Sequence, residues 1–190
     1  MSRVRELKSH LKPGQVYRRG DLLEWSSSID RHLNELVEEG TLKKLSQGVY
    51  FYPKKSVFGS VPPEEEKLIS KFLNDDRFLV TSPNAYNRLG VGTTQLYNKR
   101  VVYNHKRHGE FKLGGRTFHF QIKPHFPNKL SEEFLIVDLV NNLFQLGEDT
   151  NSVLKNVMKK AATMDSGKLK KALKNYGNVK TKKVLKSVLE

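Results

Sequence analysis

Ile29-Asp-Arg-His-Leu-Asn-Glu-Leu-Val-Glu-Glu-Gly40 decides the fold of the N-terminal part of this chain, together with the Thr41-Leu-Lys-Lys-Leu-Ser-Gln-Gly-Val-Tyr50 that follows it. In the first stretch, apolar residues recur at helical spacing on one stripe: Ile29, Leu33, Leu36 and Val37. Gly40 is suited to the position just past the end of a helix. In the second stretch, β-rich residues on both sides of Ser46-Gln47-Gly48 predict two strands joined by a turn. The sequence therefore predicts a short amphipathic helix followed by a small β-hairpin.

The residues before this helix predict three further elements. Val4, Leu7 and Leu11 keep helical spacing until Pro13-Gly14 ends the pattern. Residues 15–17 are suited to a short strand, and residues 21–25 to a brief second helix. The serines at 26–28 form a turn, and a serine side chain there can cap the next helix by accepting a backbone N–H.

The outward face of the 29–39 helix is polar at one end and acidic at the other. Its N-terminal half presents serine, arginine and asparagine side chains, with His32 on the flank, whereas Glu35, Glu38 and Glu39 lie toward the C-terminal half. This polarity favours a recognition helix of a winged helix-turn-helix, which enters the major groove of DNA by its N-terminus. Arg31 could bind guanine bidentately and Asn34 could bind adenine. The predicted DNA-contacting residues, with the hairpin as the wing, are Ser27, Ser28, Arg31, His32, Asn34, Lys43, Lys44 and Gln47.

The composition of the whole chain indicates a polyanionic partner. The 190 residues carry a formal net charge of +14, and the pI is about 9.9. The chain has no cysteine, which excludes disulfides, thiolate nucleophiles and cysteine-ligated metals. It has no apolar run of about 18 residues, so we expect no transmembrane helix and no membrane partner. The charged start lacks the apolar core of a signal peptide, and we expect a cytoplasmic protein.

The positive charge is concentrated at the C-terminal end. Residues 1–53 hold nine Lys and Arg against seven Asp and Glu, a net charge of +2, and residues 54–150 hold fourteen against eleven, or +3. Residues 151–190 hold eleven lysines against two acids, or +9. A net charge of +2 is modest for a DNA-binding unit, and winged helices also serve as protein-docking modules. The lysine-rich end therefore calls for an explanation of its own.

The fold class predicted is α+β: a winged helix-turn-helix over residues 1–53, a linker over 54–63, and a mixed α/β domain over 64–190. Pro62-Pro63 and three glutamates predict a helix start near residue 64. Strands are predicted at 78–80, 95–102 and 110–123, and helices at 64–73, 83–89, 131–146, 151–162, 166–176 and 179–189. Ser166 is the predicted cap of the helix that it begins. Residues 151–190 thus form a helical, lysine-rich subdomain.

The lysines of this subdomain lie opposite the apolar stripes of its helices. The predicted basic face consists of Lys155, Lys159, Lys168, Lys170, Lys171, Lys174, Lys182 and Lys183. These lysines could form a solvated surface, contact the DNA backbone, or contact an acidic protein. The spacing does not choose between these alternatives.

Catalytic and metal-binding patterns are weak in this sequence. His105, His108, His119 and His125 have no cysteine partner and no matching pair on a predicted helix, so we expect exposed histidines and no metal site. Asp75-Asp76 is suited to a turn. No phosphate-binding loop, serine-hydrolase elbow or zinc-protease motif occurs. We therefore expect no catalytic residues, no cofactor and no enzymatic activity.

Two motifs resemble a known family. Gly40-Thr-Leu-Lys-Lys-Leu-x-x-Gly-Val-Tyr50-x-x-Pro53 after a helix resembles the N-terminal winged helix of AbiEi-type antitoxins of type IV toxin–antitoxin (abortive infection) systems. Residues 82–91 and 99–104 resemble the middle portion of related small antitoxin-like proteins. The resemblance implies a winged helix that binds inverted repeats in its own promoter, as a monomer or weak dimer. It also implies a C-terminal domain that neutralises a nucleotidyltransferase-like toxin. The turn Ser26-Ser27-Ser28 behind Trp25 departs from the family, so its operator preference is not transferred.

The sequence therefore predicts a DNA-binding antitoxin that represses its own operon. The alternative is a stand-alone winged-helix transcription factor whose C-terminal domain dimerises or senses a ligand. An RNA-binding accessory protein that uses the lysine face is a third class.

Overall fold

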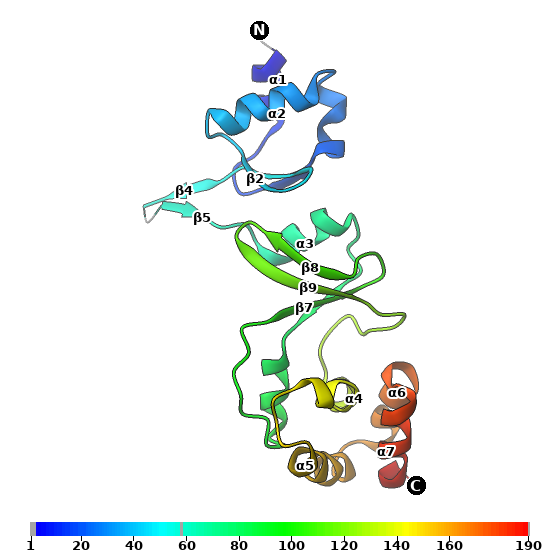
Figure 1. The fold of residues 1–190 in the computed structure, drawn as a ribbon. Helices are drawn as coiled ribbons and strands as arrows, with labels where there is room; N and C mark the ends of the chain where they lie inside the picture. Colours follow the sequence, from blue (N-terminus) through cyan, green and yellow to red (C-terminus); the bar gives the residue numbers. More distant parts are fainter. Residues whose placement is uncertain (1–2, 58, 190) are drawn as a thin grey trace. The chain divides into compact units, whose positions relative to one another are not determined.

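The computed structural model describes residues 3–57 and 59–189 and divides into two compact units (Figure 1). The first unit comprises the described residues up to Arg77 together with Glu110–Phe118. The second comprises Phe78–Gly109 and the described residues from His119 onward. The boundary predicted at residue 53 therefore falls inside the first unit, which also takes two segments from the predicted 64–190 domain.

The first unit begins with the order helix, strand, helix, helix, hairpin. The elements are α1 (Arg3–His10), β1 (Val16–Arg18), η1 (Arg19–Trp25), α2 (Ile29–Glu38), β2 (Lys43–Ser46) and β3 (Val49–Phe51). The three strands form an antiparallel sheet in the order β1-β3-β2. The element predicted at 21–25 is a 3-10 helix that begins at Arg19. Leu7, Leu22 and Leu33 are fully buried in the core of these elements, and burial of each stabilises the fold by about 1.5–3 kcal/mol.

The segment predicted as a linker forms a hairpin instead. Strands β4 (Lys54–Ser56) and β5 (Gly59–Val61) pair antiparallel, with Lys54 opposite Val61. Their residues are exposed, so the pattern of burial that marks a core strand is missing. Helix α3 (Glu65–Leu73) follows and buries Leu68, Ile69, Phe72 and Leu73.

A four-stranded sheet has the order β6-β7-β9-β8, with β6 (Leu79–Thr81), β7 (Arg100–Asn104), β8 (Gly109–Leu113) and β9 (Arg116–Ile122). Strand β7 begins at Arg100, five residues later than predicted. The backbone N–H of Tyr97 donates to the Asn84 side chain at 2.7 Å, and that of Gln95 donates to Glu148 at 3.1 Å. Because side chains from distant segments satisfy this backbone, it does not need a neighbouring strand.

The second unit ends in a group of helices, coloured yellow to red in Figure 1. The 3-10 helix η2 (Pro83–Leu89) precedes them, and the group consists of α4 (Glu132–Asn142), η3 (Leu143–Gln145), α5 (Thr150–Ala162), α6 (Ser166–Tyr176) and α7 (Val179–Leu189). Residues 134–140 of α4 are all buried, as expected for a helix surrounded by other elements. The predicted cap Ser166 is wrong: the Asp165 side chain accepts from the Lys168 N–H, because a carboxylate also favours the positive helix end.

The chain is thus a mixed α+β protein with a helical C-terminal part, as predicted. Within the described ranges, no helix is both long enough and apolar enough to cross a membrane.

A buried carboxylate lies in the core of the second unit. Asp138 of α4 is 2% exposed and accepts hydrogen bonds from the Tyr86 hydroxyl at 2.7 Å and the Tyr103 hydroxyl at 3.0 Å. The Asn142 amide donates to Asp138 Oδ1 at 3.2 Å. Burial raises the pKa of Asp138, although the tyrosine hydrogen bonds act in the opposite direction. The four side chains tie η2, β7 and α4 together.

Candidate nucleic-acid interface

Helix α2 is fixed at its start by the preceding turn. Ser28 is the N-cap residue, but its side chain makes no capping bond. Instead the Ser26 hydroxyl accepts from the Ser28 N–H at 3.2 Å. Gly40, with a φ of +77°, ends the helix, and the Leu42 N–H donates to the Leu36 carbonyl at 2.9 Å. These bonds define where the helix begins and ends.

The N-terminal half of α2 presents three exposed polar side chains: Ser27, Arg31 and Asn34. The Arg31 side chain is 70% exposed and lies 3.6 Å from Glu35, one helical turn further on. An exposed pair of this kind contributes little to stability, so Arg31 is available to other partners at low cost. Asn34 has an open amide that could bond a base edge.

His32 does not contact solvent, so its assignment to the DNA-contacting face is wrong. Its side chain is 1% exposed, and Nδ1 lies 2.7 Å from the Ser26 hydroxyl. Nε2 lies 3.3 Å from an Arg31 nitrogen. Because the guanidinium can only donate, Nε2 accepts and the Nδ1–H donates to Ser26. His32 therefore lies behind the exposed start of α2 and links the turn before this helix to Arg31.

The acidic residues around α2 are largely paired. At the start of α2, Asp30 accepts two hydrogen bonds from Arg19, at 2.6 and 2.7 Å. The hydrogen bond from Arg19 lowers the pKa of Asp30. At the far end, Glu39 accepts from Lys8 at 2.6 Å, and this bond lowers the pKa of Glu39. Phosphate approaching the helix start therefore meets a neutralised carboxylate.

A cation that the sequence analysis did not select lies at the start of α2. The Arg3 guanidinium donates to the Ser27 hydroxyl at 3.0 Å. This bond brings the beginning of α1 to the N-terminus of α2, where the helix dipole and an arginine both favour an anion. The basic residues at the start of the chain were the sequence signal for this cation. Its pairing with the serine turn is a tertiary contact, so the local sequence does not predict it.

The predicted wing residues are exposed but point in different directions. Lys43 and Lys44 are consecutive in β2, an edge strand of the sheet, so their side chains point to opposite faces. Gln47 is exposed in the turn beside Gly48, which has a φ of +68°. Each face of the sheet therefore carries only one of these two lysines. Lys54 and Lys55 of the neighbouring hairpin add two exposed cations.

The lysine-rich end of the second unit contains a defined basic hollow. The surface between α6 and α7 is lined by Lys170, Leu173, Lys174, Lys182, Lys186 and Leu189. Three of these lysines belong to the predicted basic face, and Lys186 was missed although it follows Lys182 at helical spacing. The remaining predicted lysines are exposed but lie outside this lining: Lys155, Lys159, Lys168, Lys171 and Lys183.

The histidines of the second unit do not converge. His105, His108 and His125 are exposed, and His119 is half-buried. Across residues 3–57 and 59–189, no group of three or more His, Cys, Asp or Glu side chains is placed to hold a metal ion.

The chain belongs to a family of unknown function, DUF6088, whose model matches residues 3–175. Among solved structures, it is similar to the RV2827C protein from Mycobacterium tuberculosis, with a TM-score of 0.57 and 14% sequence identity. The likeness covers 98% of this chain and 74% of that chain. At this identity it concerns the fold alone. Comparison with curated proteins gave no match.

Proposed function

We propose that this protein binds double-stranded DNA through a winged helix-turn-helix in its first unit, with α2 as the recognition helix. The observation that carries the proposal is the exposed face at the start of α2: Arg31 and Asn34 are exposed on the helix, and the Arg3 guanidinium donates to Ser27 in the turn just before it. The element order and the sheet order β1-β3-β2 support it, since a recognition helix followed by a hairpin is the arrangement of winged helices.

Within this proposal the protein is the antitoxin and autorepressor of a toxin–antitoxin operon. The motif from Gly40 to Pro53, which resembles AbiEi-type antitoxins, supports this role. The second unit would then neutralise a nucleotidyltransferase-like toxin. Its lysine-lined hollow offers a basic surface for an acidic partner or for DNA.

DNA binding is tested by fluorescence anisotropy of the full-length chain on its own promoter region and on a scrambled duplex. We expect tighter binding to the promoter. Arg31→Ala should reduce the affinity for that promoter by about 1–3 kcal/mol, because a bidentate contact to a base is lost. Arg88→Ala, which removes the same charge from an exposed position in η2, is the matched control. Equal affinities of the Arg31 and Arg88 variants would remove Arg31 from the recognition role.

The role of the hollow is tested by replacing Lys170, Lys174, Lys182 and Lys186 together by alanine. If the four lysines contact phosphate, the slope of log affinity against log salt should become shallower by about 3–4 units. The matched control replaces Lys168, Lys171, Lys180 and Lys183, which lie on the same two helices outside the lining. An unchanged slope with loss of toxin neutralisation would assign the hollow to the protein partner.

The antitoxin role is tested by expressing the neighbouring reading frame alone and together with this chain. We expect growth arrest in the first case and rescue in the second. If no neighbour encodes a nucleotidyltransferase, the stand-alone transcription factor becomes the better proposal.

A further inference from the structure

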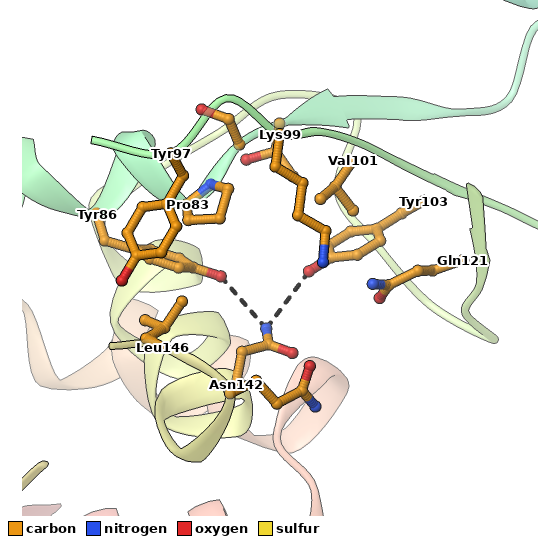
Figure 2. Close-up of a pocket in the computed structure, with 12 residues that line it drawn as sticks. Pro83, Tyr86, Tyr97, Lys99, Val101, Tyr103, Gln121, Asn142 and Leu146 are labelled. Carbon is orange, nitrogen blue, oxygen red and sulfur yellow. Dashed lines mark hydrogen bonds between the residues drawn. The ribbon is translucent and has the colours of Figure 1, made fainter. Parts of the chain in front are cut away.

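A second recessed site lies entirely within the second unit, and DNA binding by the first unit makes no use of it. This pocket of about 160 Å³ lies between η2, β7, β9 and the end of α4 (Figure 2). A cavity of this size is comparable to one that holds a benzene ring. It is lined by Thr81, Ser82, Pro83, Tyr86, Tyr97, Lys99, Val101, Tyr103, Gln121, Asn142, Gln145 and Leu146.

The pocket contains a buried hydroxyl without a protein partner. Thr81 is 8% exposed, and its Oγ1 makes no hydrogen bond to any described residue. A buried polar group without a partner costs free energy, so such groups are uncommon unless something binds them. Because Thr81 lines the pocket, a bound molecule could supply that hydrogen bond.

The pocket also has one cation and no acid in its lining. Lys99 is half-buried and forms no ion pair within the described residues. The nearby carboxylate of Asp138 lies behind the lining and is already bonded by Tyr86, Tyr103 and Asn142. The two tyrosine hydroxyls donate to Asp138 and accept from the Asn142 amide, at 3.3 Å for Tyr86 and 3.4 Å for Tyr103 (Figure 2), so they add no charge to the pocket. The free charge in the pocket is thus the ammonium of Lys99, which favours an anion.

The charged end and the most apolar part of the lining lie on different sides. Figure 2 shows Lys99 with Val101, Tyr103 and Gln121 on one side and Pro83, Tyr86, Tyr97 and Leu146 on the other, with Asn142 between them. A flat ring suits the apolar side, because aromatic and aliphatic surfaces pack well on a ring face. The Gln121 amide can orient the polar edge of the same molecule, whereas the Asn142 amide nitrogen is already bonded to Tyr86, Tyr103 and Asp138.

We propose that this pocket binds a small organic anion with a single planar ring, with its charged group at Lys99 and a hydrogen bond to Thr81. The anionic group is a carboxylate or a phosphate attached to an aromatic ring. Both share one chemistry, a flat ring plus one acid. The inference does not depend on DNA binding by the first unit.

The test uses thermal melting and calorimetry of the full-length chain with benzoate and with phenyl phosphate. Their uncharged counterparts, benzamide and phenol, are the ligand controls. We expect at least one of the two anions to raise the melting temperature and to bind with a Kd of about 1 mM or lower. Binding of benzoate alone identifies an aromatic carboxylate, and binding of phenyl phosphate alone identifies an aromatic phosphate. Binding of neither anion, or equal binding of the neutral compounds, would overturn the proposal.

Two variants assign the binding to this pocket. Lys99→Gln should weaken binding of the anion about tenfold or more, because the only cation of the lining is lost. Lys129→Gln removes the same charge from an exposed position outside the lining and should leave binding unchanged. Thr81→Val should weaken binding several-fold without lowering the melting temperature of the unliganded protein, because it removes a hydroxyl that has no partner. Anion binding that is the same in all three variants would place the ligand elsewhere.

Discussion

Replacing Tyr86 or Tyr103 by phenylalanine tests whether the buried Asp138 network holds the second unit together. Each change removes one hydroxyl and keeps the ring. The Tyr86 hydroxyl donates to Asp138 at 2.7 Å, and the Tyr103 hydroxyl lies 3.0 Å from both carboxylate oxygens. The shorter, undivided bond of Tyr86 should contribute more.

The expected cost follows from the charge of the acceptor. A hydrogen bond to a charged group contributes about 1.5–3 kcal/mol, against about 1 kcal/mol for a neutral pair. At a pH above the folded pKa of Asp138, where the acceptor is charged, we therefore expect Tyr86→Phe to reduce the free energy of unfolding by about 2–3 kcal/mol and Tyr103→Phe by about 1.5–2 kcal/mol. In an Asp138→Asn background the cost of Tyr86→Phe should fall to about 1 kcal/mol, because the acceptor is then neutral.

The pH dependence has a definite sign. Burial raises the pKa of folded Asp138 above its ordinary value of 3.8. Below 3.8 the carboxyl is neutral in the folded and unfolded states, and stability falls as the pH rises from there through the folded pKa. Loss of a tyrosine donor disfavours the charged form further, so Tyr86→Phe should cost more at a pH above the folded pKa of Asp138 than at a pH below it.

The assay is urea unfolding followed by circular dichroism, which reports all helices of the chain, most of which belong to the second unit. Tyr176→Phe is the control, because its hydroxyl has no hydrogen-bond partner within the described residues. It should cost less than about 0.5 kcal/mol. If Tyr86→Phe and Tyr103→Phe cost no more than this control, the network does not stabilise the fold.

Three further changes probe the first unit. Ser26→Ala should reduce the free energy of unfolding of the first unit by about 1–3 kcal/mol, because His32 and the Ser28 N–H lose a buried acceptor. Urea unfolding followed by Trp25 fluorescence measures this loss, and an equal effect of Ser27→Ala, at an exposed position, would contradict the prediction. Asp30→Asn should weaken the loss of stability that accompanies a fall of pH into the acid range. Arg19 lowers the pKa of folded Asp30, so the stabilisation from this pair is present above the ordinary pKa of 3.8 and is lost as the pH falls through the folded pKa. An identical loss of stability in the variant would show that the pair contributes nothing. Gly40→Ala should cost about 1 kcal/mol, since the φ of +77° strains any residue with a Cβ although the space is open; a neutral result in the same assay would mean that the helix end relaxes.

Local signals in the sequence were sufficient for most helices and for the β2–β3 hairpin. The apolar stripe of α2, the glycine after it and the Ser46-Gln47-Gly48 turn act within a few residues, so their outcome could be predicted. The burial of His32 could not, because it depends on Ser26 reaching the ring from the preceding turn. The start of β7 was misplaced for a similar reason, since Asn84 and Glu148 bind the backbone before it from distant positions.

The candidate sites show the same division. The exposure of Arg31 and Asn34 follows from helical periodicity and was predicted correctly. The packing of α6 against α7, which brings four lysines around one hollow, is a tertiary contact and could not be predicted from either helix alone. The pocket at Lys99 combines residues from 81 to 146, and no local pattern marks it.

The division of the chain between the two units also governs how the protein can be taken apart. The chain passes between the units three times, after residues 77, 109 and 118. Residues 110–118, which return to the first unit, make contacts within it. The Gly114 N–H donates to the Leu45 carbonyl at 3.1 Å, and the centroids of the Phe111 and Phe72 rings lie 5.1 Å apart. A single protease nick leaves the units covalently joined, and a fragment that stops at residue 77 lacks part of its own core. Helix α2 therefore belongs to a unit that the first 77 residues alone do not complete, and exchanging either unit with another protein would require more than one junction in the chain.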